Sequence, residues 1–151
     1  MQAAAATFRR ATVANVAALL PLMQDFCSFE RIAFDVPTRT ALLERLISDE
    51  RLGRLVLIMH EEQLAGYFVL GFGFSIEFGG RDALLDELYV VPEFRGVGLA
   101  TAALEHAFTL CRDAGISCLH LEADNFNERA HQLYLREGFK DHERHLMTKW
   151  L

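Results

Sequence analysis

The sequence predicts an α/β (α+β) fold in which a mixed central sheet carries helices on both faces. Three observations favour it. Aliphatic and β-branched runs interleave with segments of helical apolar spacing. Turn signals at residues 61–63 and 79–82 separate consecutive strand-like runs and indicate hairpins. No linker, repeat or low-complexity tract interrupts the 151 residues, so we expect one domain over residues 1–151.

The N-terminal third predicts a strand and two helices. We expect a frayed segment over residues 1–6 and a short strand over residues 7–10. Thr12 is a suitable N-cap for the first helix, which Pro21 should kink or divide because proline removes a backbone donor. Thr38 can cap the second helix, whose predicted buried stripe is Leu42, Leu43, Leu46 and Ile47.

The middle of the chain predicts three strands. Residues 55–59 are aliphatic throughout, as in a strand buried on both faces. Residues 84–91 form a further strand that Pro92 ends. Between them, successive side chains of residues 65–78 should point to opposite faces of a strand. One set is small at Gly71, Gly73 and Ser75, which leaves either a bulge or space for a ligand. The other set should face the core, and comprises Phe68, Leu70, Phe72, Phe74, Ile76 and Phe78.

The C-terminal part predicts two helices separated by a strand. An apolar helical face begins at Leu99 and ends near Gly115, a good C-terminal cap. Residues 116–123 are typical of a strand, and a helix from Asn127 closes at Gly138. Phe139 and residues 146–151 should supply the last strands.

The strand, loop and helix at residues 84–104 have the layout of an anion-binding site. The first N–H groups of a helix lack intrahelical partners, and the peptide dipoles place partial positive charge there. Gly96 and Gly98 would let these amides approach a phosphate, and Arg95 adds a cation that can donate paired hydrogen bonds. Two glycines after a strand also mark a plain tight turn, so both interpretations stay open.

Two segments carry a family resemblance. Residues 95–100, Arg-Gly-Val-Gly-Leu-Ala, resemble the Arg/Gln-x-x-Gly-x-Gly/Ala coenzyme A motif of the GNAT superfamily of acetyl-CoA-dependent N-acetyltransferases. Ala100 stands where many members have glycine. Residues 127–139 resemble the family's Asn-x-x-Ala-x-x-x-Tyr-x-x-x-Gly-Phe helix. The resemblance covers nearly the whole chain and implies a mostly antiparallel GNAT-type sheet and direct acetyl transfer from acetyl-CoA to a primary amine.

The resemblance also implies where acetyl-CoA binds. A backbone N–H group of the strand at Leu88, Tyr89 or Val90 would polarise the thioester carbonyl, and Asn127 and Arg129 would add side-chain contacts. The diphosphate would be held by the loop and the first helical turn, which comprise Arg95, Gly96, Val97, Gly98, Leu99, Ala100 and Thr101.

Four residues are candidates for catalysis. By resemblance, Tyr134 occupies the position of a general acid near the thioester sulfur; the alternative is a tyrosine that packs its ring in the core. Asp86 and Glu87 are neighbours on a strand and point to opposite faces, so only one readily serves as base or acceptor-binding residue. Glu122 is a third carboxylate candidate. In the family, the region equivalent to residues 26–35 often forms a wall of the acceptor pocket; a surface turn is the alternative.

Composition restricts the partners. The formal net charge of −6 argues against nucleic acid and favours a cationic acceptor, although it also serves solubility. A small amine, an amino sugar, a polyamine, an amino acid and a peptide N-terminus all remain open as acceptors.

The cysteines and the apolar runs indicate a compartment. Cys27, Cys111 and Cys118 are an odd number at wide spacing, which argues against a disulfide framework and for a reducing compartment. No apolar run reaches bilayer length, and residues 1–6 do not resemble a secretory signal, so we expect a cytoplasmic protein without a membrane partner. Its histidines lack zinc-site spacing, so no metal is expected.

Two other functions compete with the enzyme. One is a coenzyme A-binding regulatory or interaction module on the same fold without turnover. The other is a phosphate- or nucleotide-binding protein, although the loop lacks the lysine and Ser/Thr that end a P-loop. Dimers are common among members of the family, and the sequence leaves the oligomeric state open.

Overall fold

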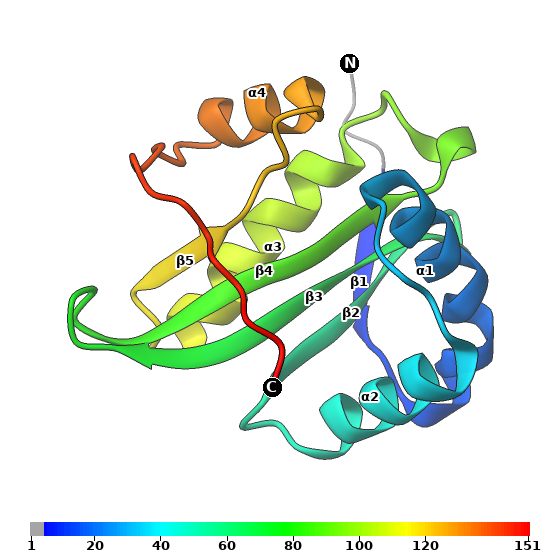
Figure 1. Ribbon diagram of the computed structural model, residues 1–151. Coiled ribbons are helices and arrows are strands. Elements are labelled where there is room, and N and C mark those ends of the chain that lie inside the picture. Colours follow the sequence, from blue (N-terminus) through cyan, green and yellow to red (C-terminus); the bar gives the residue numbers. More distant parts are fainter. Residues whose placement is uncertain (1–4) are drawn as a thin grey trace.

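The computed structural model describes residues 5–151, and its five strands form one sheet in the order β1-β2-β3-β4-β5 (Figure 1). β1 (Ala6–Arg10), β2 (Gly53–His60), β3 (Gln63–Ser75) and β4 (Gly80–Val90) pair antiparallel in sequence order. β5 (Cys118–Leu121) pairs parallel with β4. The predicted mixed, mostly antiparallel sheet is confirmed.

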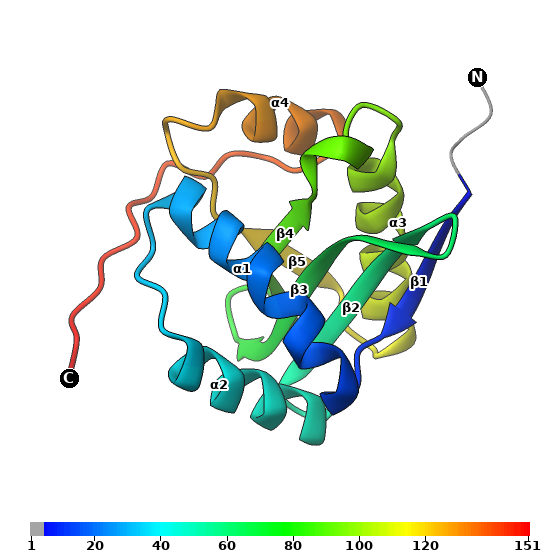
Figure 2. The same ribbon diagram turned by 90° about the vertical axis from the view of Figure 1, so that its right-hand side faces the viewer.

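Helices cover both faces of the sheet (Figure 2). α1 (Val16–Glu30) and α2 (Val36–Ser48) pack on one face, while α3 (Leu99–Asp113) and α4 (Glu128–Arg136) lie on the other. Each face therefore has its own apolar layer. The α3 layer is built around Ile58, Phe68 and Leu104, and the α1 layer around Leu19, Met23 and Tyr67.

The N-terminal segment differs from its prediction in two places. Ala6 is the first residue of β1 and pairs with His60, so it is not frayed, while residues 1–4 lie outside the described residues. Thr12 precedes a short 3-10 helix (Val13–Asn15), and α1 then runs undivided through Pro21. The predicted division is wrong because Pro21 lies on the exposed side of α1, where water can reach the carbonyl that loses its donor.

The start of α2 also lies earlier than predicted. Asp35, not Thr38, is the N-cap: its carboxylate accepts a hydrogen bond of 2.9 Å from the Thr38 N–H. Pro37 lies within the first turn, where a missing N–H costs no helical bond. Leu43 is buried as expected, but Leu42 is 58% exposed and lies outside the buried stripe.

The hairpin between β3 and β4 extends beyond the helices, as the green loop in Figure 1 shows. Its turn covers residues 76–79 rather than 79–82. Phe68 and Leu70 are buried as predicted, but Phe74 is 74% exposed and Ile76 is 90% exposed. The core prediction fails at this end because no helix within residues 5–151 covers the tip of the hairpin.

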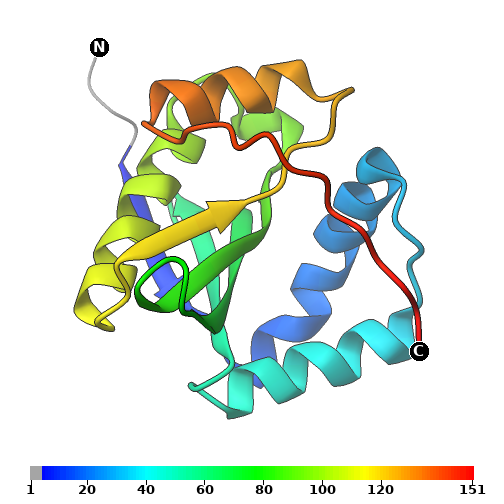
Figure 3. The same cartoon turned by 60° about the vertical axis from the view of Figure 1, so that its left-hand side comes forward.

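The C-terminal segment contains no last strand. β5 is shorter than the predicted range 116–123, and residues 140–151 form neither helix nor strand. Figure 3 shows this segment, in red, running past β5 as an extended chain outside the sheet. Side-chain bonds from Asp141 to His131 and from Arg144 to Glu77 hold it there. Across the described residues, no helix is long and apolar enough to cross a bilayer.

Candidate active site

The sheet opens between β4 and β5. Their pairing runs from Asp82 opposite Cys118 only to Leu85 opposite Leu121, whereas β4 continues to Val90 against β3. Beyond Leu85, the β5 side of β4 has no strand partner within residues 5–151. Because β4 and β5 separate after Leu85, the main-chain groups of β4 beyond this residue line one side of an opening.

A β-bulge lies where the two strands separate. Val69 pairs with Glu87 and Leu70 pairs with Leu85, so Asp86 is the extra residue of β4. A bulge bends its strand and re-aims the neighbouring side chains. Here it leaves Asp86 exposed and Glu87 buried.

The opening is a cleft of about 330 Å³, within the range of small-ligand sites. It is lined by the end of α1, by β4, by the loop after β5 and by α4. Phe26, Ile32 and Leu121 supply apolar surface. Its ionisable residues are mostly acidic, and comprise Glu30, Asp86, Glu87, Glu122, Asp124 and Tyr134.

Glu30, the last residue of α1, lies at the wall of this cleft. Its carboxylate accepts a hydrogen bond of 3.4 Å from the Asn127 side-chain amide, whose oxygen in turn caps α4 by accepting from the Ala130 N–H at 3.2 Å. Burial raises the pKa of Glu30 to about 7, and the neighbouring Asp124 adds to the rise. Glu30 therefore changes charge near neutral pH.

Neither Glu30 nor Asp124 received a role from the sequence. The region 26–35 was expected only as a pocket wall or a surface turn, and the structure places Phe26, Glu30 and Ile32 on the cleft. The one sequence feature that could have drawn attention to Glu30 is its position next to the aromatic residue Phe29. The ring of Phe29 packs on that of Phe126, with 6.0 Å between centroids. This contact joins the end of α1 to the loop after β5.

Tyr134 reaches the cleft from α4. Its ring packs edge-on against Phe139, with 5.8 Å between centroids. Burial raises the pKa of Tyr134 to about 12, and the nearby charge of Glu30 adds to the rise. The phenol therefore keeps its proton at neutral pH, as a general acid must. The structure brings Tyr134 together with Asp86, Glu122 and Glu30.

Glu87 has a different environment, although it also lines the cleft. It is 8% exposed, and both carboxylate oxygens are bonded. The Tyr67 hydroxyl donates to one at 2.8 Å, and Arg39 Nη1 donates to the other at 2.6 Å. Arg39 Nη2 also donates to Cys27 Sγ at 2.9 Å. Glu87 thus joins α1 and α2 to the sheet through both carboxylate oxygens, whereas Asp86 and Glu122 are exposed.

The glycine loop before α3 is open. Gly96 and Gly98 have φ of 80° and 88°, the left-handed region that glycine adopts without a Cβ penalty. The first helical hydrogen bond runs from the Ala102 N–H to the Gly98 carbonyl at 3.0 Å, so the amides of Leu99, Ala100 and Thr101 have no helical partner. The backbone of this loop therefore presents unpaired N–H groups at the start of α3, the feature on which the predicted anion site depends.

Two arginines that were predicted to contact the cofactor, Arg95 and Arg129, have other surroundings in this structure. Arg95 folds back on β4: its Nε donates to the Val90 carbonyl at 2.7 Å, and its guanidinium lies 5.4 Å from the centre of the Tyr89 ring. Arg129 is exposed on α4 and does not line the cleft, whereas Asn127 does. The loop amides and the two Arg95 Nη atoms, which have no hydrogen-bond partner within residues 5–151, are therefore the groups left free for an anion.

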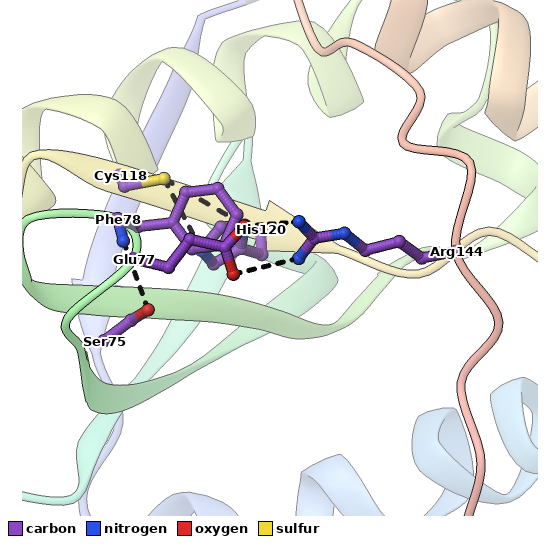
Figure 4. Close-up of polar contacts among 6 residues, drawn as sticks. All are labelled: Ser75, Glu77, Phe78, Cys118, His120 and Arg144. Carbon is purple, nitrogen blue, oxygen red and sulfur yellow. Dashed lines mark hydrogen bonds and ion pairs between the residues drawn. The ribbon is translucent and has the colours of Figure 1, made fainter.

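Cys118 and His120 lie next to each other on β5, as Figure 4 shows. His120 Nε2 lies 3.5 Å from the Cys118 sulfur and 3.4 Å from Asp82. Burial raises the pKa of the Cys118 thiol, and Asp82 raises it further, so the thiol stays protonated and weakly nucleophilic. Within residues 5–151 no group of three His, Cys, Asp or Glu side chains is arranged to hold a metal ion.

Several known proteins are similar to this chain in sequence. An uncharacterized N-acetyltransferase of Bacillus subtilis, YhfO, is 28% identical over 134 residues, covering 88% of this chain and 89% of the relative. The bovine thialysine N-epsilon-acetyltransferase is 33% identical over 78 residues, which are 52% of this chain and 45% of that enzyme.

Several solved structures are similar to this chain in fold. An integron cassette protein from the mobile metagenome of Cole Harbour Salt Marsh has a TM-score of 0.84 and 32% identity, covering 95% of this chain and 90% of that one. A predicted acetyltransferase from Clostridium acetobutylicum, solved with acetyl-CoA, has a TM-score of 0.80 at 18% identity, over 95% of this chain and 96% of that one. The model of the acetyltransferase (GNAT) family matches residues 19–139. The chain therefore belongs to the GNAT family of N-acetyltransferases.

Proposed function

We propose that this chain transfers the acetyl group of acetyl-CoA directly to a primary amine of a small cationic acceptor bound in the cleft. The observation that carries the proposal is the lining of the cleft, where several carboxylates surround one tyrosine that keeps its proton. Carboxylates attract and orient an ammonium group. The thialysine N-epsilon-acetyltransferase relative supports an amine as the acceptor.

The glycine loop and β4 would hold acetyl-CoA. The free amides at the start of α3 would bind the diphosphate, because they combine unpaired donors with the positive end of the helix dipole. Main-chain N–H groups of Leu88 or Val90 would face the thioester, since this side of β4 has no strand partner in the described chain. The N–H of Tyr89 points to β3 instead, because Val91 donates to Ala65 of the strand on that side and alternate residues point the same way. The solved relative with acetyl-CoA supports this cosubstrate.

Four side chains would then divide the chemistry. Glu30 accepts a proton from the ammonium, since its pKa of about 7 lets the carboxylate form exist at neutral pH. The free amine attacks the thioester carbon, the carbon–sulfur bond breaks, and Tyr134 donates its proton to the departing sulfur. The acylated nitrogen then gives its extra proton to the Tyr134 phenolate, which leaves a neutral amide and restores the phenol. Asp86 and Glu122 hold the remaining positive charge of the acceptor.

Thermal melting followed by a thiol-release assay tests this function. Acetyl-CoA and desulfo-CoA should raise the melting temperature of the purified protein, and ATP should not, because a ligand that binds only the folded state stabilises it. Coenzyme A thiol should then be released faster with diamines than with monoamines of the same length, which carry one positive charge fewer. Binding without release on any amine would favour the coenzyme A-binding module, and stabilisation by ATP alone would favour a phosphate-binding protein.

Replacing Tyr134 with phenylalanine should lower kcat about tenfold without weakening coenzyme A binding. The loss is modest for a general acid because a thiol with a pKa near 8.5 leaves readily as the thiolate. Isothermal titration with coenzyme A and steady-state kinetics measure the two quantities. An unchanged kcat would assign Tyr134 a packing role only.

A further inference from the structure

A contact between an arginine and two aromatic rings joins the end of α1 to the loop before α4. The rings of Phe29 and Phe126 pack edge to face, with 6.0 Å between centroids. The guanidinium carbon of Arg31 lies 4.5 Å from the centre of the same Phe126 ring. Figure 3 shows the end of α1, in blue, beside the loop that leads into α4. We call these three side chains the aromatic bridge.

The aromatic bridge borders the proposed acceptor cleft. Arg31 lies between Glu30 and Ile32 in the sequence, and both of these residues line the cleft. Asn127, which follows Phe126, lines it as well and donates to the Glu30 carboxylate at 3.4 Å. The three bridge residues themselves are exposed and do not line the cleft. The bridge therefore lies at the rim, between the cleft and solvent.

Arg31 has a backbone conformation that favours glycine. It is the C-cap of α1, with φ of 59° and ψ of 38°, in the left-handed region where a Cβ crowds the following carbonyl. The Ile32 N–H donates to the Cys27 carbonyl at 2.8 Å and closes this helix end. Glycine would form the same helix end without the crowding, so an arginine here indicates a role for its side chain.

The ring of Phe126 holds the Arg31 guanidinium only weakly. Among residues 5–151, no hydrogen bond or ion pair reaches this guanidinium, so its N–H donors are left to water. Phe126 is 45% exposed, and the ring can therefore be reached from solvent. A cation on an exposed ring gains little energy, so another cation can take its place.

We propose that the Phe126 ring binds the second cationic group of the acceptor, and that Arg31 competes with this group for the ring. The inference rests on the proposed function, in which one amine of the acceptor lies among the carboxylates of the cleft. A second ammonium or guanidinium group of the same acceptor would extend past Glu30 to the rim. Because the face of an aromatic ring attracts cations through its quadrupole, either cation can occupy that face, but not both. Phe126 and Arg31 are therefore specificity-determining residues that set how strongly a second positive charge improves binding.

Steady-state kinetics with a diamine and a monoamine of the same length test this competition. The measured quantity is the KM of the monoamine divided by the KM of the diamine. Phe126→Leu should lower this ratio about two- to fivefold, the contribution of an exposed cation–aromatic contact. Arg31→Gln should raise the ratio by a similar factor, because the competing cation is gone. Neither substitution should change kcat, since neither residue lines the cleft.

A double-mutant cycle separates competition at the ring from a general effect of charge. In the Phe126→Leu background, Arg31→Gln should leave the ratio unchanged. A rise that persists without the ring would come from long-range repulsion and would contradict the competition. Arg54→Gln is the matched control, because Arg54 lies 5.1 Å from the centre of the Phe72 ring and neither residue lines the cleft. This control should keep the wild-type ratio.

The signs of the two changes decide the outcome. If the aromatic bridge only holds α1 against the loop, Phe126→Leu and Arg31→Gln break the same contact and should shift the ratio in the same direction. That result, or no change in either variant, would overturn the proposal. Isothermal titration with the diamine makes the same comparison without turnover. Opposite shifts of its Kd in the two variants, with no thiol release on any amine, would contradict the proposed reaction and still support the subsite.

Discussion

Replacing Glu30 with glutamine is expected to lower kcat at pH 7 by about 10²–10⁴-fold, the usual contribution of a positioned general base. Glutamine keeps the size of the side chain and an oxygen that can accept from Asn127. Because Glu30 ionises at about pH 7, kcat of the wild type should rise through this pH and then level off. The variant should lack this rise in a kcat profile between about pH 5 and about pH 9.

The same substitution should stabilise the protein at alkaline pH. Burial raises the pKa of Glu30 from 4.5 to about 7, so the folded state binds its proton more tightly than the unfolded chain does. That stabilisation is complete below pH 4.5 and is lost as the pH rises through 7. The melting temperature of Glu30→Gln relative to wild type should therefore increase between these two pH values.

A matched control isolates the role of this carboxylate. Glu62 is an exposed glutamate paired with Arg9, remote from the cleft. Glu62→Gln should change neither kcat nor the pH dependence of melting. If Glu30→Gln kept full activity, the base would have to be sought at Asp86 or Glu122.

Replacing Arg39 with methionine should reduce the free energy of unfolding by about 3–5 kcal/mol, because it leaves the Glu87 carboxylate buried without its partner charge. The side chains of Arg39 and Glu87 are 17% and 9% exposed, so water cannot replace the lost ion pair fully. Tyr67 would then supply the one remaining hydrogen bond described for this carboxylate. Urea denaturation followed by circular dichroism measures the change.

Two comparisons make this prediction specific. The double variant Arg39→Met/Glu87→Gln removes both charges and should recover most of the lost stability, since no buried charge is left alone. Arg9→Met removes a pair that is 52% and 77% exposed and should cost at most about 1 kcal/mol. Equal losses for Arg39→Met and Arg9→Met would mean that the buried pair contributes no more than a surface one.

Much of the fold was predictable because alternation and helical spacing report which faces can be buried. The pattern fails where burial depends on distant segments. Phe74 and Ile76 continue the same alternation as Phe68, yet they are exposed because no helix extends over them. Residues 146–151 have the pattern of a strand, but their own chain offers no partner in the described structure.

The site shows the same division. The sequence indicated Tyr134 and Asn127 together, because both belong to the one motif at residues 127–139. Glu30 was not predictable as their neighbour, since 97 positions separate it from Asn127 and only the folded chain brings them together. The alternation of Asp86 and Glu87 predicted that one of them faces the acceptor. Which one depends on the bulge at Asp86 and on the Arg39 pair, and neither is visible in local sequence.

The separation of β4 from β5 beyond Leu85 also determines how fast backbone hydrogens exchange with solvent. In an antiparallel pair only alternate residues exchange hydrogen bonds with the partner strand, so β3 protects every second amide of residues 86–90. The intervening amides face the cleft and should exchange rapidly in deuterated water. A ligand whose amide arm lies along β4 would slow those positions alone. The exchange pattern of this short segment would therefore record coenzyme binding residue by residue, before any acceptor is known.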